Sequence, residues 1–389
     1  MFDPNLVDLT VLRKRAYNLR WATVPEGVIP LTAADPDTPC APEIAEAIAR
    51  FARDRYFCYG PPEGMADFRE SLASFYQTKR RIPASPSWIV AVDSAAYGIY
   101  LTCKAFLSPG DEAILFDPVD FLFRYSIEAA GGKPVPYALP PGADGFDIRR
   151  MEALITKKTK LICLCNPINP TGKVFTEAEL LLIGELACKY DLTILSDEIW
   201  SDIVYPPHVY TSIACLHEAI RDRAVTITGF SKSYGLAGLR IGAVMASDPR
   251  RYRLLFDASL HSSTVHGANL IAQVAAAAAL RECDGWLKEF LRHLQAMRDL
   301  CVDRLNGVPG FHCLLPEGCY VAFANIAATG LSSRQMQELL FSKARVAVVP
   351  GLPEWFGNGA DGYIRLSFAT TKEILTDALD RINNTIQQL

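Results

Sequence analysis

Residues 229–242, GFSKSYGLAGLRIG, combine residue types that could perform chemistry at one point of the chain. Lys232 stands between small residues, glycines leave space around it, and Arg240 follows eight positions later. A lysine in this setting suits condensation with an aldehyde, and the planar guanidinium of an arginine suits an anion held by paired hydrogen bonds. A loop lysine taken alone is more often solvated surface, so the rest of the chain must supply the other parts of a site.

Two further segments place polar side chains directly after apolar runs. Residues 166–172 read NPINPTG, and residues 195–200 read LSDEIW. Ligands of α/β proteins bind at the carboxyl ends of the strands, so Asn169 and Asp197 are expected at that edge of a sheet. A carboxylate buried there needs a cationic partner. Asp197 is the first choice for this role and Glu198 the alternative, whereas a bare Asn-Pro turn is usually structural.

These segments are similar, in content and in order, to the signatures of the class I and II aminotransferases, which are fold-type I enzymes that use pyridoxal 5'-phosphate (PLP). The resemblance extends over about residues 30–370. It implies that Lys232 forms a Schiff base with the cofactor and that Arg240 pairs with the cofactor phosphate. It also implies that Asp197 keeps the ring nitrogen protonated and that Asn169 donates a hydrogen bond to the phenolic oxygen.

The resemblance assigns further residues to the cofactor. Ser231 is implied as a neighbour of the lysine or the phosphate. Residues 93–98, DSAAYG, lie between an expected strand and an expected helix, so the backbone N–H groups of Ala95 and Ala96 could hold the phosphate. Tyr59, in YGPPEG, matches the tyrosine that reaches the phosphate of a neighbouring subunit in the family. A homodimer is therefore expected.

Two segments match the family's substrate site. Arg365, in GYIRLSFA, matches the arginine that binds the α-carboxylate of the substrate. Residues 31–44, LTAADPDTPCAPEI, resemble the segment that closes over the substrate and include Ala34. The pair Ala34-Asp35 is similar to the start of the motif ADMDF in the cystathionine β-lyase and cystalysin branch. Residues 34–38 of this chain, ADPDT, match only half of that motif.

The chain departs from the family pattern beside the cofactor ring. Trp200 stands where the family usually has a tyrosine and the β-lyase branch a histidine, and an indole donates one hydrogen bond but cannot ionise. Asp120 stands where the resemblance implies an aromatic side chain stacked on the ring. Phe121 is the expected substitute.

The expected function is that of a PLP-dependent aminotransferase, which moves an amino group between an α-amino acid and a 2-oxo acid. A carbon-sulfur β-lyase, or a specialised biosynthetic PLP enzyme acting on a modified amino acid, is the alternative, because the site residues are the same up to loss of the Cα proton. A PLP-fold sensor is disfavoured because no helix-turn-helix region precedes residue 30. A dinucleotide-binding protein is disfavoured because no GxGxxG follows a strand.

The elements that must position these residues follow from the hydrophobic pattern. Short apolar runs alternate with segments of helical period, which predicts an α/β fold with a mostly parallel sheet covered on both faces. The expected strands are residues 88–92, 112–116, 161–164, 192–195, 225–228 and 241–246, and the expected helices include 95–107, 121–130 and 178–190.

The regular alternation of short apolar runs and helical segments ends at about residue 285. A long amphipathic stretch, 286–305, precedes expected strands at 319–323, 346–349 and 363–368 and an expected helix at 333–341. We therefore expect a large PLP-binding domain over residues 45–285. Residues 1–44 and 286–389 are expected to form a smaller α+β domain, with the N-terminal segment folded back on it.

The composition agrees with an enzyme of small molecules. Half of the 389 residues are hydrophobic, 21% are charged, and the net charge of −4 is too balanced for binding to nucleic acid by counterion release. The 11 cysteines are scattered without a CxxC or a His at metal-ligand spacing, which predicts no metal and a reducing cytoplasm. Residues 1–15 lack the apolar core of a signal peptide, and the Ala-rich run 270–280 is too short to span a membrane.

Overall fold

A computed structural model describes residues 2–142 and 145–389 of the chain. Its main element is a seven-stranded sheet with the order β2-β8-β7-β6-β5-β3-β4. Strand β8 runs antiparallel to both of its neighbours and every other pair is parallel, as the alternating pattern predicts. The strands are β2 Ile89–Val92, β3 Glu112–Asp117, β4 Lys133–Ala138, β5 Thr159–Cys165, β6 Thr193–Asp197, β7 Ala224–Gly229 and β8 Gly242–Met245.

The middle strands of this sheet are apolar because both faces are covered. All residues of β6 are buried, and β5 exposes only Lys160. Near-continuous apolar strands are typical of parallel sheets packed between helices. The helices of this part are α2 Pro42–Arg53, α3 Ala66–Arg80, α4 Ala95–Phe106, α5 Phe121–Ala129, α6 Ile148–Glu152, α7 Glu177–Lys189, α8 Glu218–Arg221, α9 Pro249–Ser259 and α10 Leu270–Glu282.

Strand β4 is an element that the hydrophobic pattern misses. Its sequence, KPVPYA, contains two prolines, which usually interrupt a strand because they donate no hydrogen bond. Among the described strands it lies at the edge of the sheet and pairs only with β3, so it tolerates prolines whose missing N–H groups would face away from the sheet.

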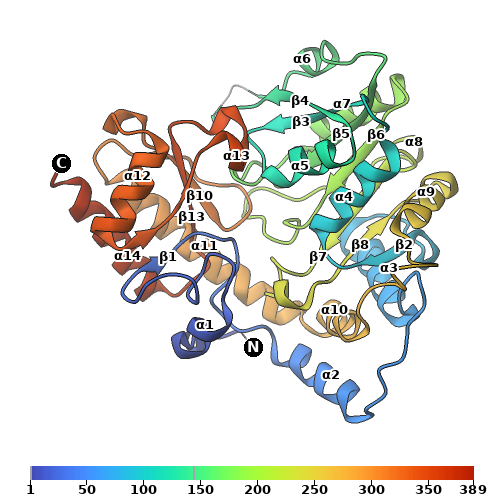
Figure 1. Ribbon diagram of the computed structural model, residues 1–389, viewed down its shortest axis with the longest axis horizontal. Helices are drawn as coiled ribbons and strands as arrows, with labels where there is room; N and C mark the ends of the chain where they lie inside the picture. Colours follow the sequence, from blue (N-terminus) through green and yellow to red (C-terminus); the bar gives the residue numbers. More distant parts are fainter. Residues whose placement is uncertain (1, 143–144) are drawn as a thin grey trace.

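The C-terminal part forms a second, smaller sheet with the antiparallel order β12-β13-β10-β9. Figure 1 shows its elements β10 and β13 with α12 and α14 on the other side of the molecule from the main sheet, and β1 of the N-terminal segment beside them. The strands are β9 His312–Cys313, β10 Val321–Asn325, β12 Val349–Pro350 and β13 Tyr363–Ser367, and the helices of the two ends are α1 Leu9–Arg15, α11 Asp284–Asn306, α12 Ser333–Leu339, α13 Pro353–Phe356 and α14 Lys372–Ile386.

The N-terminal segment folds back on this C-terminal part, as predicted. Strand β1, Ile29–Pro30, pairs in parallel with β11, Val346–Ala347. The single strand expected at residues 346–349 is wrong in one respect, because the chain passes from β11 to β12 in the other sheet at Val348. The domain boundaries at residues 45 and 285 stay a prediction.

Eleven cysteines are free thiols in the structure. Among the described residues, no helix is both long enough and apolar enough to cross a membrane.

Candidate active site

The carboxyl ends of four parallel strands position the site. Strands β3, β5, β6 and β7 end at Asp117, Cys165, Asp197 and Gly229. The chain then turns, and a polar or aromatic side chain of the site follows each strand within four residues. These side chains are Asp120, Asn169, Trp200 and Lys232.

A cavity of about 410 Å³ lies at this edge, between the main sheet and the C-terminal part. It brings together all of the predicted site residues except Tyr59. The predicted residues on its walls are Ala34, Ala95, Ala96, Phe121, Asn169, Asp197, Trp200, Ser231, Lys232, Arg240 and Arg365.

Lys232 lies in the connection between β7 and β8, and its amine points into the cavity. Its Nζ donates a hydrogen bond to the backbone oxygen of Ala34 at 2.6 Å and lies 5.3 Å from the ring centre of Trp200. Burial lowers the pKa of the amine, and the nearby carboxylates of Asp35 and Asp120 act in the opposite direction. A lysine with a lowered pKa is more readily neutral, which a nucleophile or a proton acceptor requires.

Asp197 is the last residue of β6 and is buried. Burial raises the pKa of its carboxyl to about 7, although the N–H of Ile199 donates to Oδ1 at 3.1 Å and lowers it. This N–H is an uncharged partner, so the carboxylate remains suited to a cationic N–H group of a ligand. Glu198, the alternative, is directed elsewhere, because its Oε1 accepts hydrogen bonds from the hydroxyls of Ser212 and Ser196 at 2.5 Å and 3.1 Å.

The N-terminus of α4 forms part of the cavity wall. Ser94 caps this helix by accepting a hydrogen bond from the N–H of Tyr97, and its hydroxyl also accepts one from Arg240 at 2.9 Å. The first N–H groups of a helix attract anions, and they belong here to Ala95 and Ala96. Gly242 permits this arrangement, because a Cβ at its position would lie 2.8 Å from the backbone nitrogen of Ala95.

Arg365, on β13, lines the same cavity and is buried. Its two terminal nitrogens donate to Asn169 Oδ1 at 3.0 Å and to the backbone oxygen of Thr32 at 3.1 Å. Its Nε is buried with no hydrogen-bond partner among the described residues. Burial lowers the pKa of the guanidinium and the charge of Asp120 raises it. A buried donor without a partner is costly, so this arginine suits an anionic ligand.

Asp120 holds the amide of Asn169 in one orientation. Its Oδ2 accepts a hydrogen bond from Asn169 Nδ2 at 2.7 Å, and its Oδ1 caps α5 by accepting one from the N–H of Leu122 at 3.1 Å. Phe121 follows on the cavity wall, edge to face with Trp355 at 5.5 Å between ring centres. The resemblance implies one aromatic side chain at this point of the wall, and the structure has the carboxylate of Asp120 and the ring of Phe121 there.

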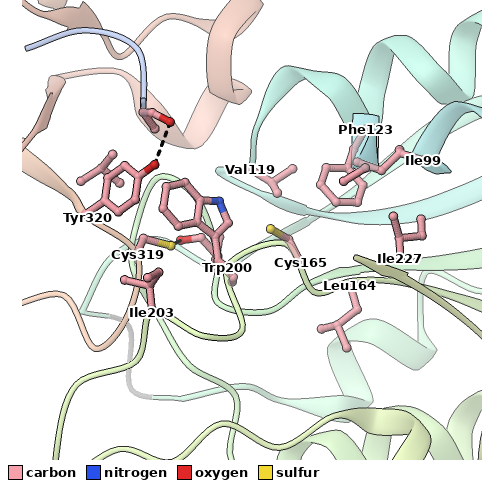
Figure 2. Packing of buried hydrophobic residues seen from close by; sticks show 14 of the residues in the cluster. Ile99, Val119, Phe123, Leu164, Cys165, Trp200, Ile203, Ile227, Cys319 and Tyr320 are labelled. Atoms are coloured by element: carbon pink, nitrogen blue, oxygen red, sulfur yellow. Dashed lines mark hydrogen bonds between the residues drawn. The ribbon is translucent and has the colours of Figure 1, made fainter. Parts of the chain in front are cut away.

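Trp200 is buried against Tyr320, with the ring centres 4.7 Å apart and the planes at 74°. Figure 2 shows these two rings beside each other, with Cys319 below them and Cys165 on the side of Trp200 away from Tyr320. The hydroxyl of Tyr320 donates to the backbone oxygen of Ala34 at 3.1 Å, so this oxygen accepts from both Tyr320 and Lys232. The segment around Ala34 is further held by a buried ion pair between Arg20 and Asp37.

Tyr59 does not reach the cavity of its own chain. It is 87% exposed, and its ring centre lies 5.1 Å from that of His266.

Sequence reasoning missed the residues that come from distant segments. Thr32, Tyr320, Trp355 and Phe356 line or support the cavity, and Phe356 lies under the guanidinium of Arg365 at 5.1 Å. Thr32 lies within residues 31–44, the segment expected to close over the substrate, and Trp355 and Phe356 lie in WFGNGADG, residues 355–362, directly before the segment around Arg365. Tyr320 gave no such signal. Among the described residues, no group of three His, Cys, Asp or Glu side chains could hold a metal ion.

Comparison with known proteins agrees with this geometry. The family model described as aminotransferase class I and II matches residues 26–382. The chain is 33% identical over 364 residues to YugH of Bacillus subtilis (strain 168), a protein named as an aminotransferase, and covers 92% of it with 93% of its own length. It is 31% identical over 368 residues to the aspartate aminotransferase of the same organism, with the same coverage.

Solved structures are similar over the whole chain. A PLP-bound protein of Clostridium difficile 630, named as an aminotransferase, superposes with a TM-score of 0.91 at 26% identity and covers 99% of this chain and 100% of its own. Cystalysin of Treponema denticola superposes with a TM-score of 0.91 at 22% identity and covers 100% of this chain and 99% of its own. At that identity the second likeness is one of fold.

Proposed function

This chain belongs to the class I and II aminotransferases and is a PLP-dependent enzyme that moves an amino group between an α-amino acid and a 2-oxo acid, and from that premise we propose which of its residues do so. The observation that carries the proposal is the cavity, which collects a lysine, a buried carboxylate and a buried arginine from separate segments of the chain. Lys232, Asp197 and Arg365 are the proposed reacting and binding groups.

The residues on the cavity walls fit PLP. Asp197 is a buried carboxylate with an uncharged partner, which suits a protonated pyridine nitrogen. The N-terminus of α4, Ser231 and Arg240 suit a phosphate, and the free N–H of the Asn169 amide suits a phenolic oxygen. When bound, the cofactor supplies an electron-withdrawing ring that stabilises negative charge at the substrate Cα.

The chain's own residues orient the substrate and move protons. Arg365 binds the α-carboxylate through its Nε, which has no partner among the described residues, and through the terminal nitrogen that here donates to the backbone oxygen of Thr32. The amine of Lys232, with its pKa lowered by burial, takes the proton from the substrate Cα and passes it to the C4′ carbon of the cofactor. The segment around Ala34 covers the site and excludes water from these steps.

Transamination, and not β-elimination, is the reaction of this site. The matched relatives are named as aminotransferases, whereas the likeness to cystalysin is one of fold.

We propose further that the enzyme is a homodimer. Tyr59 is exposed in the single chain together with the neighbouring Tyr56 and Phe57, which are 77% and 62% exposed. Three exposed aromatic side chains within four residues favour burial against a second copy. Tyr59→Phe should weaken the retention of PLP without changing the mass of the particle, which light scattering measures. A fully active monomer would contradict a shared phosphate site.

The 11 free thiols support a reducing compartment such as the cytoplasm.

Product analysis tests the reaction, and chemical labelling tests the residue. The holoenzyme supplied with an amino acid and a 2-oxo acid should yield a new 2-oxo acid and a new amino acid, and release of pyruvate with ammonia would contradict the proposal. Reduction with borohydride should leave the pyridoxyl group on Lys232 in a peptide map. A label on another lysine would overturn the assignment of Lys232.

A further inference from the structure

One charged side chain of the cavity orients Asn169 but binds neither the cofactor nor the substrate in the proposed reaction. The charged residues on the described walls are Asp120, Asp197, Lys232, Arg240 and Arg365. In the proposed reaction Arg240 binds the cofactor phosphate, Lys232 moves the Cα proton and Arg365 binds the α-carboxylate. Asp197 pairs with the ring nitrogen. Asp120 is the one that remains.

Burial raises the pKa of the Asp120 carboxyl, and the charges of Arg365 and Lys232 lower it. In the proposed reaction the substrate α-carboxylate pairs with Arg365 and the amine of Lys232 works at Cα, which leaves the charge of Asp120 without a counter-charge. Both of its hydrogen-bond partners, the side-chain amide of Asn169 and the backbone N–H of Leu122, are uncharged. A carboxylate accepts about four hydrogen bonds, so two of its acceptor positions are free. Asp120 therefore brings to the cavity a charge that a second carboxylate of a substrate would meet with repulsion.

The side chains beside Asp120 also favour a cation. Phe121 and Trp355 are only partly buried and line the same cavity, edge to face at 5.5 Å. Aromatic ring faces attract ammonium and guanidinium groups, and apolar ring edges accommodate the aliphatic stem that carries such a group. A carboxylate next to two aromatic rings has the composition of a site for a cation on an apolar chain.

We propose that Asp120 is a specificity-determining residue that binds the amine or guanidine of a basic α-amino acid substrate and disfavours dicarboxylic amino acids. This inference rests on the proposed function, in which Arg365 holds the α-carboxylate and Lys232 acts at Cα. The distal cation then lies against Asp120, with its stem along Phe121 and Trp355. Charge, and not shape alone, selects the substrate.

The test compares three amino donors of similar chemistry at Cα. Single-turnover reaction of the holoenzyme, followed by the change in cofactor absorbance, gives a rate constant per concentration for lysine, for its neutral analogue norleucine and for aspartate. In the native enzyme we expect lysine to react faster than norleucine and aspartate slower. The two ratios to norleucine cancel any general change in activity.

Asp120→Asn removes the charge but keeps the shape and an acceptor for Asn169. We expect the ratio of lysine to norleucine to fall about tenfold or more and the ratio of aspartate to norleucine to rise, because one partner of a charge pair has been neutralised. Asp120→Ser, which still caps α5, gives the same measurement if the asparagine variant fails to fold.

Asp117→Asn is the matched control. This carboxylate stands three residues earlier, accepts a hydrogen bond from the N–H of Gly359 at 3.0 Å, and lies outside the walls of the cavity. Its variant should leave both ratios unchanged.

The outcomes separate this inference from the function on which it rests. Equal loss for all three donors in Asp120→Asn would show that Asp120 only orients Asn169, and would overturn the inference while leaving the reaction intact. A native enzyme that prefers aspartate to norleucine would overturn it as well. No reaction with any donor would refute the proposed function, and the inference with it.

Discussion

The two halves of the cavity are built from different parts of the chain. The cofactor half, which consists of Ala95, Ala96, Asp197, Lys232 and Arg240, comes from strand ends and connections of the main sheet.

The substrate half consists of Ala34, Asp120, Trp355 and Arg365, and three of these four belong to the N-terminal segment or the C-terminal part. The cofactor half is fixed by one rigid framework, whereas the substrate half is assembled from separate pieces. The cofactor half can therefore stay the same while residue changes in the substrate half alter which substrate binds.

The largest effect is expected from the centre of the cofactor half. Lys232→Ala should lower the rate of amino transfer by more than about 10³-fold, because both the attachment of PLP and the movement of the Cα proton depend on one amine. Steady-state assay with saturating PLP measures this rate.

Lys173→Ala is the control, since Lys173 pairs with Glu179 at 2.9 Å away from the site. If the Lys232 variant kept a tenth of the activity, the cofactor half would not be where the chemistry takes place.

The second effect is on stability and depends on pH. Because the pKa of Asp197 is raised from 3.8 to about 7 in the fold, the folded state holds a proton there that the unfolded chain releases above about pH 4. The free energy of unfolding of the PLP-free protein should therefore fall as the pH rises from about 4 to about 7, by up to ~4 kcal/mol from this group.

Asp197→Asn should remove this part of the pH dependence and leave the remainder. Urea unfolding of both proteins at several pH values measures the difference. A variant whose stability follows the same curve as the native protein would mean that Asp197 is solvated in the fold.

The third prediction concerns the substrate half. Arg365→Ala should lower kcat/KM for amino acids by tens-fold to thousands-fold, because loss of one partner of a desolvated ion pair costs about 2 to 5 kcal/mol. The absorbance of bound PLP should persist, since the cofactor half is untouched. An amine without a carboxylate serves as the internal control and should lose little reactivity. Equal losses for both substrates would assign Arg365 a structural role and erase the distinction between the halves.

The smallest effect is expected at Gly242, where β7, β8 and the N-terminus of α4 meet. Gly242→Ala places a Cβ 2.8 Å from backbone atoms of Ser94 and Ala95, and overpacking of this kind typically costs about 1 to 3 kcal/mol. The Kd for PLP should rise about tenfold, measured by titration of the PLP-free protein. Gly238→Ala is the control, because no atom of the described residues lies within 4 Å of its added Cβ. An unchanged Kd in Gly242→Ala would place the phosphate elsewhere.

The sequence predicts the cofactor half better than the substrate half for a physical reason. Asn169, Asp197 and Lys232 follow apolar strands closely, so a local pattern of strand and turn is enough to place them at one edge. The contact between Phe121 and Trp355 joins segments more than 200 residues apart, and no local pattern contains it.

The same reasoning explains where the prediction of the fold is incomplete. Strand β4 is missed because its prolines are acceptable only at a sheet edge, and edge position is a property of the whole sheet. The break at Val348 is missed because a continuous apolar run does not reveal that its two ends pair with different sheets. The role of Tyr59 stays a prediction because its proposed partner is a second copy of the chain.

The pairing of β7 with β8 also has a consequence for the order of folding. Gly229 and Gly242 face each other in this antiparallel pair, so the connection that carries Lys232 and Arg240 closes a loop of only 12 residues. Short loops cost little entropy to close, and contacts of low sequence separation form early. The contacts between Arg365 and Thr32 or Asn169 span 333 and 196 residues. We expect refolding chains to gain affinity for PLP before they gain affinity for an amino acid, so the cofactor can act as a template on which the C-terminal part completes the site.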